Sequence, residues 1–357
     1  MNRRMMLNGT IFILLIILGI LLYVLSLELM GGDPVLQNKE MTSSVAKDQV
    51  KIGISLGTLK EERWLKDRDI LIAKLKELGA DVIVQNANND DQDQIDQVRF
   101  LLSQHIDLLI LVPNDLVKAA KAVEIAKSEG VKVISYDRLV INADVDAYLS
   151  FDNVKVGELM AEHILRHVES GNLLIMNGAQ SDHNTAMIKE GYDRVLAPYV
   201  KSGKIRIVRE DWAPNWLKEY AFHQMDQFLK EDTVHAVIAG NDGLADGIYQ
   251  ALAEHRLAGK TILVGQDADL SACQRIVEGT QTMTVYKPIE KLADLTAITA
   301  MKLARGEPFE TKETINNGKY NIPYFALEPI AVTKENIDET VIKDGYHMQS
   351  EIYRDHP

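Results

Sequence analysis

The sequence predicts an α/β protein with two doubly wound parallel-sheet lobes, preceded by one transmembrane helix. Three observations support this fold class. Runs rich in Val, Ile and Leu alternate with amphipathic segments of helical period along most of the chain. The alternation falls into two blocks, which are separated by a loop at residues 139–153. A stretch near the N-terminus is apolar and contains no charged side chain.

The apolar stretch is NGTIFILLIILGILLYVLSL, from Asn8 to Leu27. At about 1.5 Å per residue, a helix of this length spans roughly 30 Å, which is the hydrocarbon thickness of a membrane. Arginines precede the stretch, and the positive-inside rule then places everything after it outside the cytoplasm. Because no small-x-small cleavage site and no lipid-acceptor cysteine follow, we expect residues 1–30 to be a retained single-pass anchor in the cell membrane. A cleaved signal is the alternative, and residues 31–49 are expected to be a flexible tether.

The first block predicts four strands with a helix between each pair. Near-continuous apolar strands that alternate with amphipathic helices indicate a parallel sheet covered on both faces. The strands are expected in KIGISLG, DVIVQNAN, DLLILVPN and KVISYDR, and the helices in RWLKDRDILIAKLKELG, IDQVRFLLSQ and VKAAKAVEIAKSEG.

The second block repeats this pattern with five strands. A helix from Ile289 to Ala304 follows the last strand, and the tail from Lys319 to Asp338 is extended, as a return crossing between lobes would be. The strands are expected in NLLIMNGA, IRIVRE, HAVIAGND, ILVGQDA and TMTVYKP, and further helices begin near Asn153, His183, Trp216, Gly243 and Ser271.

Composition and motifs exclude several functions. The net charge of -13 makes a phosphate-binding surface for nucleic acid a poor hypothesis. The single cysteine, Cys273, cannot form an intrachain disulfide and is expected to be a buried apolar side chain. The chain contains no GxxxxGK[ST], HExxH or GxSxG motif and no GxGxxG after a strand. We therefore expect no catalytic residue, no cofactor and no metal ion.

Polar residues gather where the predicted strands end. Ligands of doubly wound sheets bind outside the carboxyl ends of the strands. Carboxylate, amide and guanidinium groups can grip the vicinal hydroxyls of a sugar, and an indole can stack on the apolar face of its ring. The alternative is that these residues only cap helices and that the tryptophans are core aromatics. The relevant segments are 57–58, 85–88, 113–114, 137–138, 177–178, 241–242, 266–269 and Lys287, with Trp64, Trp212 and Trp216.

Five motifs resemble the xylose-binding branch of the type I periplasmic sugar-binding protein family. They are ERWLKDRD, ISYDRL, NDGLADG, GQDADL and GTQTMTVYKP, and the resemblance extends from about residue 50 to about residue 350. It implies two lobes joined by a multi-strand hinge that close on a sugar. The first lobe would comprise 50–150 and 288–322, and the second 151–287 and 323–350, with 351–357 as a tail. The ligand-binding residues implied by the motifs are Arg63, Trp64, Asp137, Arg138, Asp182, Asn184, Trp216, Asn241, Asp267 and Lys287.

The resemblance and the N-terminal stretch together give the expected function. We expect an extracytoplasmic receptor for D-xylose or a related monosaccharide that signals to the extracytoplasmic domain of a membrane histidine kinase and so regulates sugar uptake genes. The alternative is the substrate-binding subunit of an ABC-type xylose importer, whose partner would be an ABC permease. An enzyme acting on pentoses is a third hypothesis, but no spacing of the carboxylates supports it. The preference for a pentose rests on the resemblance alone.

Overall fold

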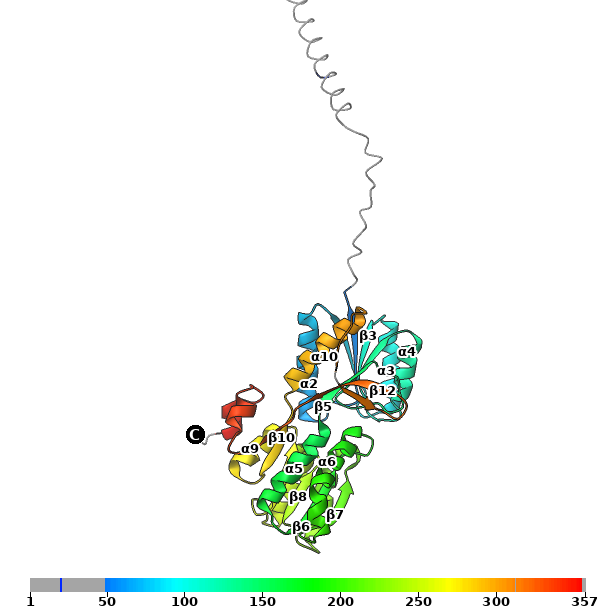
Figure 1. The fold of residues 1–357 in the computed structure, drawn as a ribbon. Coiled ribbons are helices and arrows are strands. Elements are labelled where there is room, and N and C mark those ends of the chain that lie inside the picture. The colour runs from blue at the N-terminus through cyan, green and yellow to red at the C-terminus, as the bar shows by residue number, and fades with distance from the viewer. Residues whose placement is uncertain (1–19, 21–48, 312, 355–357) are drawn as a thin grey trace, which may run out of the picture. The chain divides into compact units, whose positions relative to one another are not determined.

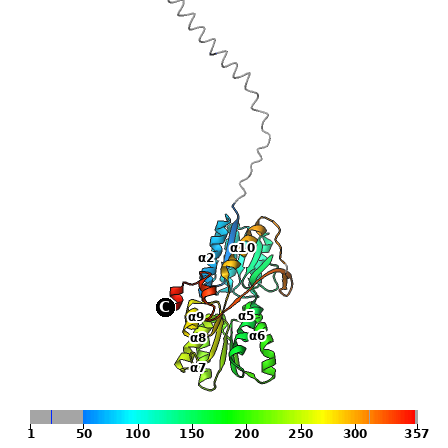
Figure 2. The ribbon, with the colours of Figure 1, turned by 60° about the vertical axis from the view of Figure 1, so that its left-hand side comes forward.

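The computed structural model describes residues 20, 49–311 and 313–354. Apart from Ile20, the predicted anchor lies outside these residues, and so does the predicted tether except for Gln49. The residues from 49 onward build two α/β lobes, each around one sheet (Figures 1 and 2). Two α/β lobes were predicted, and their presence is confirmed.

The first lobe is built on a seven-stranded sheet in the order β11-β12-β5-β4-β3-β1-β2. Helices α2 (Glu62–Glu77) and α10 (Ile289–Ala304) pack on one face, and α3 (Asp91–Ser103) and α4 (Ala120–Ser128) pack on the other. Buried aliphatic strand residues fill both interfaces, as near-continuous apolar strands require. The strands are β1 (Lys51–Leu56), β2 (Asp81–Asn86), β3 (Leu108–Val112), β4 (Lys132–Tyr136), β5 (Ala147–Phe151), β11 (Glu313–Asn316) and β12 (Asn321–Leu327).

The second lobe is built on a six-stranded sheet in the order β13-β10-β9-β8-β6-β7. Helices α5 (Asn153–His167) and α6 (His183–Lys201) cover one face, and α7 (Lys218–Leu229) and α8 (Asp242–Glu254) cover the other. The strands are β6 (Gly171–Asn177), β7 (Ile205–Trp212), β8 (Ala236–Ala239), β9 (Ile262–Gln266), β10 (Met283–Tyr286) and β13 (Ile330–Val332). The remaining helices are the one-turn η1 (Pro214–Trp216), α9 (Leu270–Glu278), η2 (Asp338–Ile342) and α11 (Gln349–Tyr353).

Cys273 on α9 is fully buried in a small apolar cluster with Tyr286 and Ile352, as predicted. Burial raises the pKa of its thiol, which stays protonated at neutral pH. Cys273 therefore behaves as an apolar core residue.

The sheets are mixed: the predicted parallel arrangement is found in the doubly wound strands, but one edge strand of each sheet is antiparallel. Strand β11 pairs antiparallel with β12, and β13 pairs antiparallel with β10. These strands come after the last helix of the alternation, so that short turns and crossings, rather than helices, set their direction. The sequence prediction also missed β5, whose residues are all buried but which lay within the predicted loop. Strands β4 and β5 are parallel neighbours, but no helix joins them. The alternation of strand and helix from which the other strands were predicted is therefore missing at β5.

The chain crosses between the lobes three times, at residues 151–153, 286–289 and 327–330. The first and third crossings are joined by a hydrogen bond from the Asp152 amide to the Leu327 carbonyl, at 2.9 Å. The division expected from the sequence cuts β12 between residues 322 and 323, whereas the whole strand belongs to the first sheet. We therefore propose that the boundary between the lobes lies at the crossing at 327–330.

Candidate functional site: a polar pocket between the lobes

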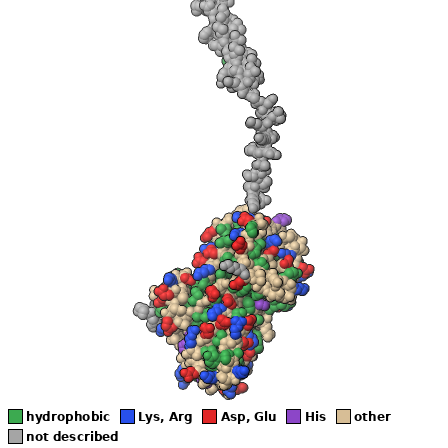
Figure 3. All heavy atoms as spheres, viewed as in Figure 1, with side chains coloured by type: hydrophobic (Ala, Val, Ile, Leu, Met, Phe, Trp, Pro, Cys, Tyr) green, Lys and Arg blue, Asp and Glu red, His purple; other side chains and the backbone are tan. Residues whose placement is uncertain are grey.

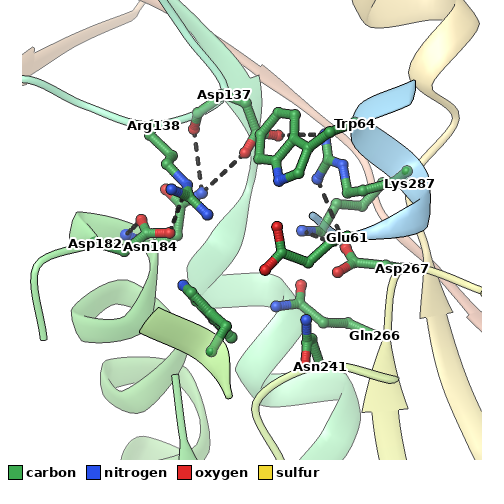
Figure 4. A pocket seen from close by; sticks show the side chains of 12 residues that line it. Glu61, Trp64, Asp137, Arg138, Asp182, Asn184, Asn241, Gln266, Asp267 and Lys287 are labelled. Carbon is green, nitrogen blue, oxygen red and sulfur yellow. Dashed lines mark hydrogen bonds and ion pairs between the residues drawn. The ribbon is translucent and has the colours of Figure 1, made fainter. Parts of the chain in front are cut away.

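A pocket with about 320 Å³ of empty space, partly open to solvent, lies between the two lobes. Side chains of both lobes converge on it at the carboxyl ends of the parallel strands (Figure 4). All ten residues that the sequence predicted as ligand-binding line this pocket, together with two that it did not predict. The lining is Glu61, Arg63, Trp64, Asp137, Arg138, Asp182, Asn184, Trp216, Asn241, Gln266, Asp267 and Lys287.

In the first lobe, the lining comes from the start of α2 and the end of β4. Arg63 and Trp64 lie in the first turn of α2, and Asp137 and Arg138 follow β4 directly. Both guanidinium groups lie over the Trp64 ring, at 4.5 Å for Arg63 and 5.2 Å for Arg138, and these cation–π contacts hold the indole in place. Trp64 is 2% exposed.

In the second lobe, the lining comes from five strand ends. Asp182 and Asn184 begin α6 after β6, and Trp216 ends η1 after β7. Asn241 lies between β8 and α8. Gln266 ends β9 and Asp267 follows it, and Lys287 follows β10. This convergence is the one expected for a doubly wound sheet.

The predicted helix-capping role is also present at two of these residues. Asp182 caps α6 by accepting the Asn184 amide at 3.0 Å, and Asn241 caps α8 by accepting the Leu244 amide at 2.9 Å. Both side chains nevertheless line the pocket. Capping and a place in the site are therefore compatible, because a helix that follows a strand begins at the ligand-binding edge of the sheet.

Arg63 is the centre of a buried network of charges. Its Nε lies 2.9 Å from Asp67 Oδ2, its Nη2 2.8 Å from Asp137 Oδ2 and its Nη1 3.6 Å from Asp267 Oδ1. Tyr136 donates its hydroxyl to Asp67 Oδ1 at 2.6 Å. Burial alone would raise the pKa of Asp137, but nearby cations, Arg63 foremost, hold it below its ordinary value. Asp137 therefore stays ionised in the pocket wall.

Direct contacts around the pocket join the two lobes. Arg138 Nε lies 2.7 Å from Asp182 Oδ2, which is an ion pair between the lobes. The Leu116 amide donates to the Ser181 carbonyl at 2.9 Å, and Lys60 Nζ donates to the Trp216 carbonyl at 3.1 Å. The two lobes thus contact each other on several sides of the pocket, which is a closed arrangement of the lobes.

Several buried polar atoms of the lining have no hydrogen-bond partner among the described residues. They include Gln266 Oε1, Asp267 Oδ1 and Trp216 Nε1. Gln266 donates its Nε2 to the Gly240 carbonyl at 2.7 Å, which leaves its oxygen free. Asp267 Oδ1 forms an ion pair with Lys287 Nζ at 3.0 Å, but the angles at this contact are not those of a hydrogen bond. Because an unsatisfied buried polar group costs about 1–3 kcal/mol, this arrangement fits a ligand that supplies both donors and acceptors.

Three lining residues have a left-handed backbone conformation that is unusual for residues other than glycine. The φ angles are 60° for Asp137, 54° for Trp216 and 96° for Asp267. Such conformations cost on the order of 1–3 kcal/mol each and cluster at functional sites. The strained backbone positions belong to three residues that line one pocket, which supports its assignment as the functional site.

Glu61 and Gln266 were not predicted from the sequence as ligand-binding residues. Gln266 lies at the carboxyl end of β9, in a segment that was noted for its position but carried no predicted role. Glu61 is the N-cap residue of α2 and precedes a second glutamate. Two acidic residues at the start of a helix are already explained by their favourable interaction with the helix dipole. The sequence therefore gave no reason to place Glu61 in a pocket.

Gly178 is in close contact with the indole of Trp216. A Cβ at Gly178 would lie 2.0 Å from Cη2 of that ring. We expect Gly178→Ala to displace Trp216 and to weaken ligand binding at least tenfold, with a changed tryptophan fluorescence spectrum. Titration of the ligand followed by fluorescence tests this. The matched control is Gly243→Ala, where a Cβ would meet its nearest atom at an ordinary 3.5 Å; equal affinities of the two variants would contradict the prediction.

The fold and the pocket define the class of protein: two α/β lobes with a polar pocket between them. Residues 52–308 match the model of the periplasmic binding protein domain, and the chain belongs to the periplasmic binding protein family.

Among its relatives, the chain is 46% identical to the D-xylose-binding periplasmic protein of Haemophilus influenzae, over 87% of this chain and 95% of that protein. It is 44% identical to the D-xylose-binding periplasmic protein of Escherichia coli, over 85% and 93% of the two chains. Among solved structures, a carbohydrate transporter solute binding protein from Chloroflexus aurantiacus in complex with D-glucose superposes with a TM-score of 0.79. It is 30% identical, and the match covers 84% of this chain and 97% of that one.

These findings correct the predicted location. A single-pass protein of the cell membrane was expected, but the two relatives at 44–46% identity are periplasmic proteins, and the prediction is wrong. Among residues 20, 49–311 and 313–354, none of the helices has the length and apolarity needed to cross a membrane. The predicted link to a histidine kinase also has no support among the relatives named above.

Proposed function

We propose that this chain binds D-xylose, or a closely related pentose, as the periplasmic substrate-binding component of an ABC-type importer. The observation that carries the proposal is the pocket itself, in which paired charges surround unpaired acceptors and one unpaired indole donor. The identity of 44–46% to two D-xylose-binding proteins supports the choice of sugar. The ten residues predicted from the sequence are proposed as the ligand-binding residues.

The charges of the lining favour a neutral ligand. Its three cations, Arg63, Arg138 and Lys287, are each already paired with a carboxylate. An anionic ligand would displace these partners and meet the unpaired oxygens of the lining. A neutral sugar instead offers hydroxyls that donate and accept, and hydrogen bonds to charged groups contribute roughly 1.5–3 kcal/mol each.

A sugar between the lobes would favour the closed state. A ligand shifts a conformational equilibrium only if it binds one state better than the other. A sugar that contacts Asp137 in the first lobe and Asp267 in the second gains both contacts only when the lobes are together. We propose that closure over the sugar creates the surface that an ABC permease recognises, and that the sugar is released unchanged.

Nucleic acid is not a proposed partner. On the face shown in Figure 3, basic side chains are interspersed with acidic ones and form no continuous patch. Together with the net charge of -13, this gives phosphate groups no favourable surface on that face.

Calorimetric titration of the full-length protein with xylose, ribose, arabinose, glucose and galactose tests the ligand. We expect xylose to bind most tightly, because the chain is 44–46% identical to two D-xylose-binding proteins. Absence of binding to all five sugars would contradict a monosaccharide-binding function. Tightest binding of a hexose would retain the sugar-binding function and overturn the assignment to a pentose.

Transport and sensing can be separated in a strain that lacks this gene and expresses the xylose permease and ATPase from a constitutive promoter. A substrate-binding component is required for transport itself, so we expect uptake of labelled xylose to remain lost in this strain. Complementation with the wild-type gene is the control. Restored uptake without this protein would instead show that it acts through expression of the uptake genes.

A further inference from the structure

Glu61 places a carboxylate in the middle of the pocket. Figure 4 shows its side chain pointing between the groups of the two lobes, toward the space that they surround. Glu61 is the N-cap residue of α2, yet its side chain makes no capping hydrogen bond. Its Oε2 is buried and has no hydrogen-bond partner among the described residues. The carboxylate therefore satisfies neither the helix nor a neighbouring side chain.

The charge of Glu61 is also unmatched. Within the described part of the chain, no Lys, Arg or His nitrogen lies within 4 Å of its carboxylate, whereas every other carboxylate of the lining has a cation partner. Those pairs are Asp137 with Arg63 at 2.8 Å, Asp182 with Arg138 at 2.7 Å, and Asp267 with Lys287 at 3.0 Å.

A carboxylate oxygen that is shielded from solvent needs a hydrogen-bond donor. Without one, its burial costs more free energy than the burial of an unpaired neutral polar group. The cations of the lining are committed to other carboxylates, and Gln266 donates its amide to the Gly240 carbonyl. The ligand is then the source of the donor. A sugar hydroxyl is the donor that a neutral ligand of this pocket carries.

We propose that Glu61 is a further ligand-binding residue, which accepts a hydrogen bond from one hydroxyl of the bound sugar. The inference rests on the proposed sugar-binding function and deepens it. Glu61 enters the pocket from the same turn of α2 as Arg63 and Trp64, which adds a charged acceptor to the first-lobe side of the site. Its unpaired charge makes the site selective for neutral sugars over sugar acids.

Calorimetry of full-length variants with xylose tests the proposal. We expect Glu61→Ala to lower the affinity 10- to 100-fold and Glu61→Gln, which keeps an uncharged acceptor, to lower it less. The matched control is Glu77→Ala, at the exposed C-terminal end of the same helix, with an affinity within twofold of wild type. Because the side chain of Glu61 makes no hydrogen bond or ion pair that stabilises the fold, the melting temperature without sugar should not fall.

A set of four xylose analogues, each lacking one hydroxyl, identifies the group that Glu61 binds. For one analogue, the loss of the hydroxyl and the loss of Glu61 should be non-additive, because both remove the same hydrogen bond. Additive losses for all four analogues, or a Glu61→Ala variant with wild-type or tighter xylose affinity, would overturn the inference. A wild-type protein that binds no pentose would instead overturn the proposed function, and the inference with it.

Discussion

An Asp267→Asn variant is expected to bind xylose about 100-fold more weakly than the wild type. Asp267 Oδ1 lies 3.0 Å from Lys287 Nζ and 3.6 Å from Arg63 Nη1, but the angles at the Lys287 contact are not those of a hydrogen bond. Two hydroxyl contacts to this carboxylate, at roughly 1.5 kcal/mol or more each, correspond to about two orders of magnitude in affinity. Asparagine is the suitable replacement, because it tolerates the φ of 96° better than alanine does.

Isothermal calorimetry measures the loss of affinity, and denaturation without sugar shows whether the fold is retained. Some loss of stability is expected, because Lys287 is 4% exposed and would lose its counter-ion. The matched control is Asp232→Asn, the same exchange at an exposed position of the second lobe, and it should leave the affinity unchanged. A folded Asp267→Asn variant with an affinity within threefold of wild type would show that Asp267 does not bind the ligand.

The sequence allowed accurate prediction wherever a strand and a helix alternate. The helix predicted at Ile289–Ala304 has these bounds in the structure, and the strand predicted in DLLILVPN is β3. Both elements belong to the doubly wound core, where the spacing of the apolar residues follows from the face that each element buries. Strand β5 and the antiparallel edge strands were missed or misdirected, because their place depends on how the chain crosses between lobes and not on a local pattern.

The candidate site shows the same division. Asp137, Asn241 and Lys287 could be predicted to lie together, because each follows a parallel strand, and ligands of doubly wound sheets bind outside the carboxyl ends of the strands. Their contacts with a sugar remain predictions. Glu61 could not be found, because its direction into the pocket depends on tertiary structure. Residues positioned by topology are therefore accessible to sequence analysis, and residues positioned by a side-chain direction are not.

Replacement of Arg63 by methionine is expected to destabilise the protein by about 3–5 kcal/mol, which is the usual cost of removing one partner from a buried ion pair. Arg63 is 3% exposed, and its contacts Asp67 and Asp137 are 1% and 2% exposed, so that water cannot replace the guanidinium. Urea denaturation without sugar measures the loss. The control is Arg99→Met, which removes an exposed pair with Asp96 and should change the free energy of unfolding by less than about 1 kcal/mol.

The pH dependence of the Arg63→Met variant separates lost charge pairing from lost packing. In the wild type, the pKa of Asp137 is lowered, so that its contribution to stability is present at neutral pH and is lost only as the pH falls through that value. Without Arg63, burial dominates and raises the pKa of Asp137, as it already does for Asp67. The folded variant then binds protons more readily than the unfolded chain, and its stability increases as the pH falls. The difference in unfolding free energy between variant and wild type should therefore shrink from pH 7 to pH 5, whereas a difference that is constant over this range would indicate that packing, and not charge, accounts for the role of Arg63.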